Sequence, residues 1–186
     1  MRLGLVLLPE PSVSEACVAT SRALVAARSA RVVLDATRAL AHVSILHVEL
    51  DRCDPAAAWA ETEASLPREA ELSGMSLALL PYTAPYNAPH DPRTATMAYL
   101  IVPCTAALRA MEERALGLEW VRAGRVTTGN GDRFQPHVTL AIWDGAVWPA
   151  SDDLAAPLAR RGPFRARLAL GVIGENGVYR ETLHGG

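Results

Sequence analysis

The sequence contains no lysine, only three cysteines and no long apolar run, and each absence limits what the protein can be. Cys17, Cys53 and Cys104 are widely spaced and form no C-x-x-C pair, which argues against a disulfide framework and a structural zinc site. The longest apolar runs are far shorter than the roughly 20 residues of a membrane-spanning helix. The apolar segment 3–8 is too short for a signal peptide and lacks a clean cleavage site after it, so we expect a cytoplasmic protein that does not contact a membrane.

All eighteen basic residues are arginine, yet the net charge is −2. A protein that holds long nucleic acid by its backbone usually carries a strong excess of basic residues. We therefore expect the partner to be a small nucleotide or an RNA end, and no long double-stranded nucleic acid. Half of the residues are apolar and a fifth are charged, which is typical of a globular chain. A length of 186 residues suits a single domain, which we expect to act as a monomer.

The apolar periodicity predicts strands and helices whose order is repeated in the two halves of the chain. In the first half, we expect elements over residues 3–8, 12–28, 32–34, 43–50, 54–67 and 75–80. In the second half, we expect them over residues 97–102, 105–116, 134–143, 151–160, 165–173 and 178–183. The last two form a hairpin around Glu175-Asn176-Gly177, because Asn-Gly favours a tight primed turn. The proline-rich segment 81–92 is typical of a connector.

The spacing supports a duplicated topology. Leu3 precedes His42 by 39 residues, and Ala98 precedes His137 by the same number. We therefore predict an α+β fold with two lobes, approximately 1–92 and 93–186, that form one bilobal domain over residues 1–186. Mainly antiparallel sheets flanked by helices would enclose a central cleft. The alternative is a coincidence of order in a chain of alternating elements.

Two tetrapeptides, His42-Val-Ser-Ile and His137-Val-Thr-Leu, share the pattern histidine, apolar, hydroxyl, apolar. Alternate side chains of a strand lie on one face, about 7 Å apart over two residues. Each imidazole should therefore point the same way as its hydroxyl, while the apolar side chains face the core. One such tetrapeptide is a weak signal, because a lone strand histidine is usually a core residue. Two copies at equivalent places in two similar halves are a strong one.

Two such strands across a cleft would surround a small anion with two imidazoles and two hydroxyls. A neutral imidazole can accept a proton from water, and a protonated one can donate to the departing sugar oxygen. The hydroxyls of Ser44 and Thr139 can donate to the non-bridging oxygens of the phosphate. Side chains would then supply every chemical role, so we expect no metal and no cofactor. The motifs predict a phosphoesterase with His42 and His137 as catalytic residues.

At these residues the sequence resembles the two-histidine (2H) phosphoesterases, which include 2′-5′ RNA ligase-like proteins and cyclic nucleotide phosphodiesterases. The resemblance rests on His42-Val-Ser-Ile, on the heptapeptide 134–140 (Phe-Gln-Pro-His-Val-Thr-Leu) and on the repeated order of elements, so it covers most of the chain. It implies that both histidines are catalytic and that Ser44 and Thr139 bind the phosphate. The first motif departs from the family pattern at Ala41, where proline is frequent, and at Ser44, where threonine is commoner, but neither change removes a functional group.

Several other residues are candidates for substrate contacts. Trp143 has the strand parity of His137 and could stack on a base at the rim of the cleft, although core packing is an equal alternative. Three tyrosines are weaker stacking candidates: Tyr82, Tyr86 and Tyr99. Arg125 and Arg133 flank a Gly-Asn-Gly loop from which a guanidinium could reach a second phosphate, although a solvated surface position suits either alone.

The remaining histidines are expected to be structural or solvated. His47 lies five residues after His42 and hence on the opposite strand face, unless a bulge intervenes. His90 falls in the proline-rich connector and His184 lies near the C-terminus. Metal binding by the motif histidines is a weaker hypothesis, because no nearby carboxylate or cysteine completes a ligand set.

The substrate stays open between a cyclic nucleotide phosphate, 2′,3′-type or related, and a 2′-5′ phosphodiester. A second hypothesis is a non-catalytic protein of the same fold that binds a nucleotide or an RNA end. The intact histidine pair favours the enzyme, because binding alone would tolerate the loss of either imidazole. RNA end joining, the reverse reaction, is less favoured because the sequence has no nucleotide-triphosphate motif.

Overall fold

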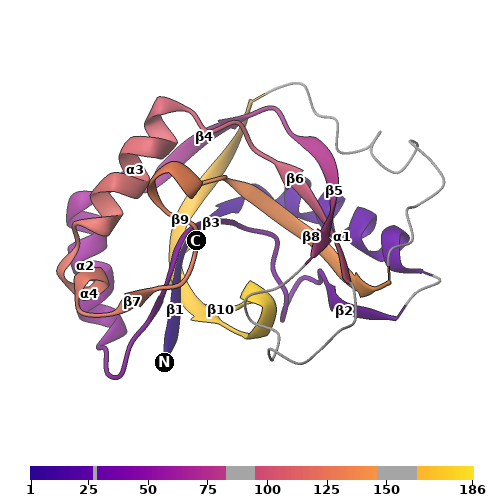
Figure 1. Ribbon diagram of the computed structural model, residues 1–186. Helices are drawn as coiled ribbons and strands as arrows, with labels where there is room; N and C mark the ends of the chain where they lie inside the picture. Colours follow the sequence, from indigo (N-terminus) through magenta and orange to yellow (C-terminus); the bar gives the residue numbers. More distant parts are fainter. Residues whose placement is uncertain (27–28, 83–94, 146–162) are drawn as a thin grey trace.

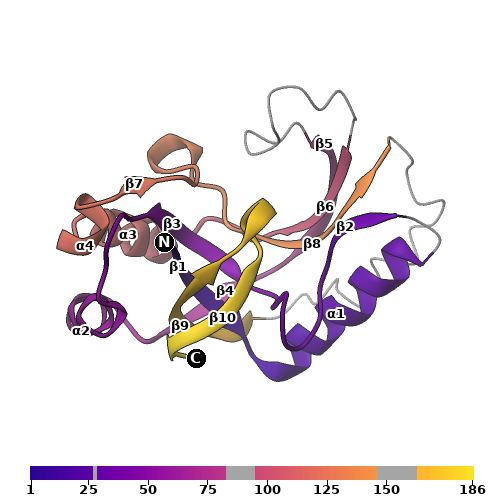
Figure 2. The same cartoon turned by 90° about the horizontal axis from the view of Figure 1, so that it is seen from below.

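The computed structural model describes residues 1–26, 29–82, 95–145 and 163–186, and for residues 80–82 only the backbone. Two antiparallel sheets form its centre, with helices along their outer sides (Figures 1 and 2). This confirms the predicted α+β class and the antiparallel sheets. Among these residues no helix is long and apolar enough to cross a membrane.

The first sheet, sheet A, has the strand order β10-β9-β1-β3-β7, and β4 also pairs with β9. Its strands are β1 (Arg2–Pro9), β3 (Val43–Glu49), β4 (Glu69–Ser73), β7 (Arg125–Val126), β9 (Pro163–Ile173) and β10 (Tyr179–Gly185). The second sheet, sheet B, has the order β2-β8-β6-β5. Its strands are β2 (Ala30–Val33), β5 (Ser76–Tyr82), β6 (Ala95–Ile101) and β8 (His137–Asp144).

Each sheet contains strands from both halves of the chain. The central pair of sheet A, β1 and β3, is completed by β9 and β10 from the second half, and sheet B takes β2 and β5 from the first. The helix α1 (Pro11–Val25) follows β1 but contacts β8 of sheet B, and so leads the chain across to β2. The two sheets therefore do not correspond to the two halves of the chain on either side of residue 92, where the sequence predicted the boundary between lobes.

Capping residues explain where two of the helices begin and end. Asp54 accepts hydrogen bonds from the N–H groups of Ala56 and Ala57 and begins α2 (Pro55–Ser65). Thr105 caps α3 (Ala106–Leu116) in the same way, and Gly117 ends it. A single-turn helix, α4 (Glu119–Arg122), and two 3₁₀ turns, η1 (Gly131–Arg133) and η3 (Glu175–Gly177), complete the described helices. The helix expected over 151–160 lies outside the described residues.

The predicted hairpin at the C-terminal end is present, with Asn176 at φ 54° and Gly177 at φ 72° in its turn. This hairpin forms the β10 edge of sheet A, and Figure 2 shows its turn directed towards sheet B. Its residues contribute to two small apolar clusters apart from the main core. Tyr179 packs with Val6 and Ile173 of sheet A, while Val178 packs against a cluster that includes Ile142 of sheet B. The hairpin therefore packs against residues of both sheets.

A prediction on stability follows from Gly171 of β9, which lies close against the backbone of β10 and the ring of Tyr179. A Cβ atom at this position would lie 2.0 Å from the carbonyl oxygen of Glu181 and 2.4 Å from the hydroxyl of Tyr179. Gly171→Ala should therefore lower the free energy of unfolding by about 3 kcal/mol, as overpacking does. The control is Gly117→Ala, at φ −79°, which should change it by less than about 1 kcal/mol. Urea denaturation of the two variants measures the difference, and equal losses would contradict this account of the hairpin.

Candidate active site

Both motif histidines are held by the same local hydrogen bond. His42 Nδ1–H donates to the carbonyl oxygen of Leu40 at 2.9 Å, and His137 Nδ1–H donates to that of Gln135 at 2.7 Å. A carbonyl oxygen can only accept, so Nδ1 carries the hydrogen and Nε2 is the bare nitrogen of each neutral ring. His42, just before β3 of sheet A, and His137, the first residue of β8 in sheet B, therefore both have Nε2 available for proton transfer.

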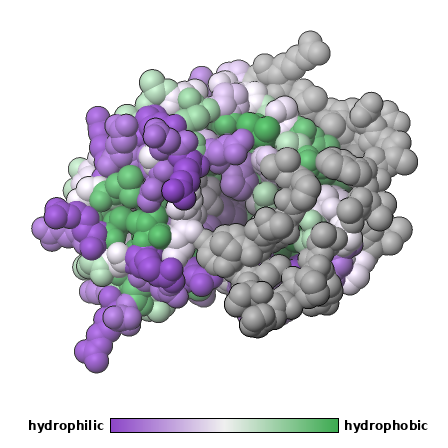
Figure 3. All heavy atoms as spheres, in the orientation of Figure 1, coloured by the Kyte–Doolittle hydropathy of each residue, from purple (hydrophilic) through white to green (hydrophobic). Residues whose placement is uncertain are grey.

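The charge of His137 affects the pKa of His42, which places the two imidazoles in one neighbourhood. Burial lowers the pKa of His42 to about 4, the bond to Leu40 opposes this shift, and the charge of His137 lowers the pKa further. Burial likewise lowers the pKa of His137, and its bond to Gln135 opposes the shift. His42 is buried whereas His137 is partly exposed. The protein surface is hollowed near the centre of the view in Figure 3, which has the orientation of Figure 1.

Each motif strand carries a β-bulge at the fourth residue of its motif. In β3, Ser44 pairs with Val6 and Leu46 with Leu5, so Ile45 is the extra residue. In β8, Thr139 pairs with Tyr99 and Ala141 with Ala98, so the extra residue is Leu140. A bulge reverses the alternation of side chains beyond it. Positions five residues after the histidines therefore return to the face that carries the motif.

The bulge in β3 brings His47 onto the face of the strand that carries Ser44. Its Nε2 lies 2.9 Å from Ser44 Oγ, and its ring centroid lies 6.3 Å from that of His42. The sequence placed His47 on the opposite strand face unless a bulge intervened. The bulge at Ile45 does intervene, so His47 lies on the face of Ser44. Burial, followed by the charges of His42, Arg2 and His137, lowers the pKa of His47 to about 3.

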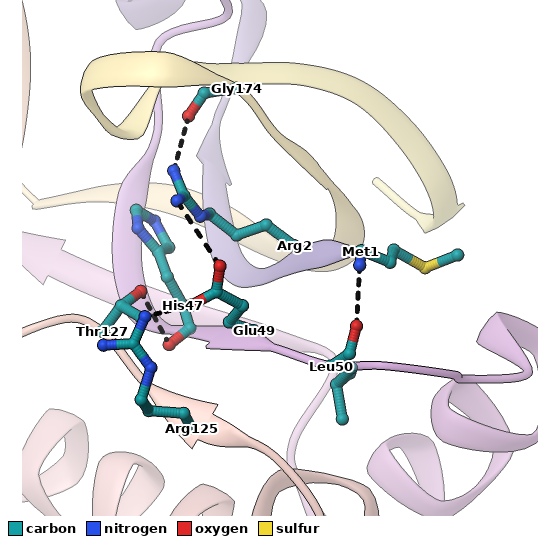
Figure 4. Close-up of polar contacts among 8 residues, drawn as sticks. All are labelled: Met1, Arg2, His47, Glu49, Leu50, Arg125, Thr127 and Gly174. Carbon is teal, nitrogen blue, oxygen red and sulfur yellow. Dashed lines mark hydrogen bonds and ion pairs between the residues drawn. The ribbon is translucent and has the colours of Figure 1, made fainter. Parts of the chain in front are cut away.

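The backbone of His47 is fixed on both sides by the segment after β7. Its N–H donates to Thr128 Oγ1 at 3.1 Å, and its carbonyl oxygen accepts from the N–H of Thr127 at 2.8 Å. Figure 4 shows the neighbouring polar residues, where Arg2 donates to the carbonyl of Gly174. Arg125 and Glu49 form an ion pair in the same view, so Arg125 is a partner of Glu49 in this structure.

The bulge in β8 determines the position of Trp143. Its side chain has no exposed surface and belongs to the main hydrophobic core. Strand parity counted from His137 would place it at the cleft rim, but the bulge at Leu140 turns it to the core face. The stacking role considered for Trp143 is therefore wrong, and its core alternative is confirmed.

Two tyrosine rings pack against the motif histidines. Tyr99 meets the ring of His137 edge-on, with centroids 5.3 Å apart and planes at 69°. Tyr179 lies 5.5 Å from the ring of His42, and its carbonyl oxygen accepts a hydrogen bond from the N–H of Leu40 at 3.1 Å. Tyr179 therefore supports the carbonyl-bearing residue that orients His42. Tyr179 could not be predicted as a site residue, because nothing in the sequence of the C-terminal hairpin signals contact with a motif 137 residues earlier.

The loop ahead of the second motif is anchored by α3. The fully buried Glu112 accepts a hydrogen bond from the N–H of Gly131 at 2.9 Å, and Arg109 donates to the carbonyl of the same glycine. The guanidinium of Arg109 also lies 5.5 Å from the ring centroid of Phe134. These contacts fix the chain shortly before Gln135, whose carbonyl orients His137.

Other residues named in the sequence analysis are exposed, half-buried or outside the described side chains. Arg133 is exposed in η1, four residues before His137. Tyr82 ends β5, and its side chain lies outside the described residues, as do Tyr86 and His90. Ser44 and Thr139 are both half-buried. Within the described part of the chain, no three or more His, Cys, Asp or Glu side chains gather in a way that could hold a metal ion.

A cavity of about 870 Å³ lies beside α1 and β9, with Leu40 and Ala41 in its wall. The motif histidines and hydroxyls do not line it. This cavity therefore does not include the residues that the motifs predict to be catalytic.

Comparisons with known proteins support the fold and leave the activity open. No family model matches the sequence, and no curated protein matches it. The crystal structure of TT0787 of Thermus thermophilus matches with a TM-score of 0.51 and 17% identity, over 99% of this chain and 96% of that one. Usb1 of Kluyveromyces marxianus gives a TM-score of 0.46 and 12% identity, over 98% of this chain and 95% of that one. The chain therefore shares the fold of TT0787 over nearly its whole length.

The buried histidines predict a loss of stability in acid. The unfolded chain takes up protons near pH 6.5, whereas folded His42 and His47 stay neutral down to about 4 and 3. The unfolded state then binds more protons, so the free energy of unfolding should fall as the pH drops from 6.5 to 5. Each histidine contributes a slope of up to about 1.4 kcal/mol per pH unit.

Urea denaturation of the wild type and of His47→Gln tests this slope. The variant should show a shallower fall by about 1 kcal/mol per pH unit in acid. Above pH 7 the two proteins should run parallel, which serves as the internal control. Parallel curves over the acid range as well would show that His47 titrates normally in the folded protein.

Proposed function

We propose that the protein is a metal-independent phosphoesterase that hydrolyses a cyclic nucleotide phosphate, 2′,3′-type or related, or a 2′-5′ phosphodiester. His42 and His137 act as its acid–base pair. The observation that carries the proposal is the matched orientation of the two rings, each with Nδ1 on a carbonyl two residues earlier. Such a bond fixes the tautomer and leaves Nε2 for proton transfer. The fold shared with TT0787 is compatible with the proposal but carries no information on activity.

The surroundings of the two histidines favour His42 as the base and His137 as the acid. His42 is 7% exposed and has a pKa of about 4, so it is neutral at pH 7. His137 is partly exposed, and an anionic phosphate beside it would raise its pKa towards the protonated form. Substrate binding would thus supply the proton that the acid needs.

The reaction then runs as a single displacement. His42 Nε2 accepts a proton from water as the water oxygen attacks phosphorus. The bond from phosphorus to the sugar oxygen breaks, and His137 Nε2–H donates its proton to that oxygen. Ser44 and Thr139 donate hydrogen bonds to the non-bridging oxygens as their charge changes. Proton exchange with solvent restores both rings, and a phosphomonoester leaves.

The charge of the chain favours a small substrate. With a net charge of −2, it lacks the basic excess that binding along a nucleic-acid backbone requires. A mononucleotide or an RNA end needs only local contacts around one phosphate. Arg133, exposed close to the second motif, and Tyr82 are proposed to contact the remainder of such a substrate.

The second candidate is a non-catalytic protein that binds a nucleotide or an RNA end at the same place. One observation favours it: the lowered pKa values leave neither motif histidine protonated at pH 7 before a ligand binds. The enzyme requires the ligand itself to raise the pKa of one ring. Turnover assays separate the two candidates.

The first test of the enzyme is a panel of 2′,3′-cyclic nucleotides, ADP-ribose cyclic phosphate and 2′-5′ dinucleotides, with products identified by phosphorus NMR. On the active substrate, His42→Ala and His137→Ala should each lower kcat by roughly 10²–10⁴, because each removes one proton-transfer group. The rate should fall at both low and high pH, since one ring must be neutral and the other protonated. Nucleotide binding without turnover of any member of the panel would leave the binding protein as the function. Variants that retain near-full turnover would show that His42 and His137 are not the acid–base pair.

A leaving-group comparison tests which histidine is the acid. A p-nitrophenyl phosphodiester releases p-nitrophenolate, a stable anion whose departure needs little proton donation. On that substrate the loss caused by His137→Ala should shrink by at least roughly tenfold, whereas the loss caused by His42→Ala should persist. The opposite pattern would exchange the two roles.

Exhaustive treatment with EDTA tests metal independence. The proposed mechanism assigns every step to side chains, so the rate should be unchanged within about twofold after chelation. The matched control is EDTA presaturated with magnesium, which corrects for effects of the chelator itself. A complete loss that a single divalent ion restores would identify a metallohydrolase instead.

A further inference from the structure

We infer that His47 is a positioning residue of the proposed phosphodiester site, which holds Ser44 with its hydroxyl hydrogen free for the substrate phosphate. The inference rests on the proposed function and on the distance of 2.9 Å between His47 Nε2 and Ser44 Oγ. In this arrangement Nε2–H donates to Ser44 Oγ, and the serine O–H donates in turn to a non-bridging oxygen.

The direction of this hydrogen bond decides what Ser44 can do. A serine that donates to a bare Nε2 uses its only hydrogen and presents lone pairs to the site, which repel an anionic oxygen. A serine that accepts from Nε2–H keeps its hydrogen for the phosphate, and donation by His47 strengthens that second bond. An anionic substrate therefore favours the tautomer of His47 with the hydrogen on Nε2.

The ring of His47 is held where it can perform this role. Both backbone groups of His47 are bonded to the segment after β7, as described above. Two glycines lie against the ring: a Cβ at Gly4 would lie 3.4 Å from its Cδ2, and one at Gly177 would lie 3.5 Å from its Cε1. The ring is 7% exposed, and its lowered pKa keeps it neutral with a single N–H at pH 7.

The second motif provides an internal comparison. The position equivalent to His47 is Ile142, which is 1% exposed and packs with Val32 and Ala95. Thr139 thus lies in a motif without a histidine at that position, but its β-branched side chain is itself restricted at χ1. Ser44 has no such branch, and the imidazole of His47 supplies an external constraint in its place.

A double-mutant cycle tests whether His47 acts through Ser44. On the substrate found in the panel, Ser44→Ala and His47→Leu should each lower kcat/KM by roughly 10- to 100-fold. The double variant should fall no more than about twofold below Ser44→Ala, since both changes remove one function. In the matched cycle with Thr139→Ala, the losses should multiply. Multiplying losses in both cycles would overturn the inference.

A conservative variant guards against a purely structural loss. The amide of His47→Gln can place an N–H donor near the position of Nε2, so this variant should keep kcat/KM within about threefold of the wild type. Its thermal unfolding, compared with that of His47→Leu, shows whether both are folded. A folded His47→Gln variant as slow as a folded His47→Leu variant would overturn the inference.

Nitrogen NMR of the ¹⁵N-histidine-labelled protein gives a readout that does not depend on turnover. With inorganic phosphate as the probe, at pH 7, His47 should carry its hydrogen on Nε2 and leave Nδ1 bare. The opposite tautomer in the phosphate-bound protein would overturn the inference. If the panel shows no turnover, the proposed function fails while this tautomer still decides the role of His47. Failure of phosphate to bind at all would overturn the inference, while turnover of the panel tests the proposed function separately.

Discussion

One extra residue in each motif strand determines which side chains surround the site. Without the bulges at Ile45 and Leu140, simple alternation would turn His47 into the core and Trp143 out of it. An imidazole in the apolar core would cost free energy unless it were hydrogen-bonded. An exposed indole would lose the favourable free energy of burying its apolar surface. The bulges instead leave the first three residues of each motif in regular alternation and reverse everything after them. The site and the core therefore depend on the same irregularity.

The sequence predicts the part of the site that precedes each bulge. His42 with Ser44, and His137 with Thr139, are separated by two residues, and that spacing needs no knowledge of the partner strand. The bulged residues carry no signal, because Ile45 and Leu140 are each followed by another apolar residue, Leu46 and Ala141. An apolar pair at that point fits a regular strand between two covered faces equally well. Regular strand alternation therefore places His47 and Trp143 on the wrong faces of their strands.

The pairing of the strands could not be predicted from the sequence either. Apolar periodicity shows which side of a strand is buried, but it does not show which neighbour covers it. The exchange of β2, β5, β9 and β10 between the halves therefore could not be read from the sequence, although the type of most elements could. That exchange brings Tyr179 of the last strand against His42, a contact between residues 137 positions apart. Long-range pairing, and not local propensity, completes the first half of the site.

The two motifs share a frame but differ in what surrounds it. Each has a histidine held by a carbonyl two residues earlier, a hydroxyl two residues later, a bulge, and a tyrosine ring packed on the imidazole. Beyond the bulge they differ, since His47 lies beside Ser44 and Ile142 occupies the equivalent place near Thr139. The first motif is also more deeply buried at its histidine. Burial disfavours a charged ring, and partial exposure tolerates one. In the proposed mechanism, two nearly identical motifs thus hold opposite protonation states around one phosphate, because the surrounding packing and not the motif residues sets the difference.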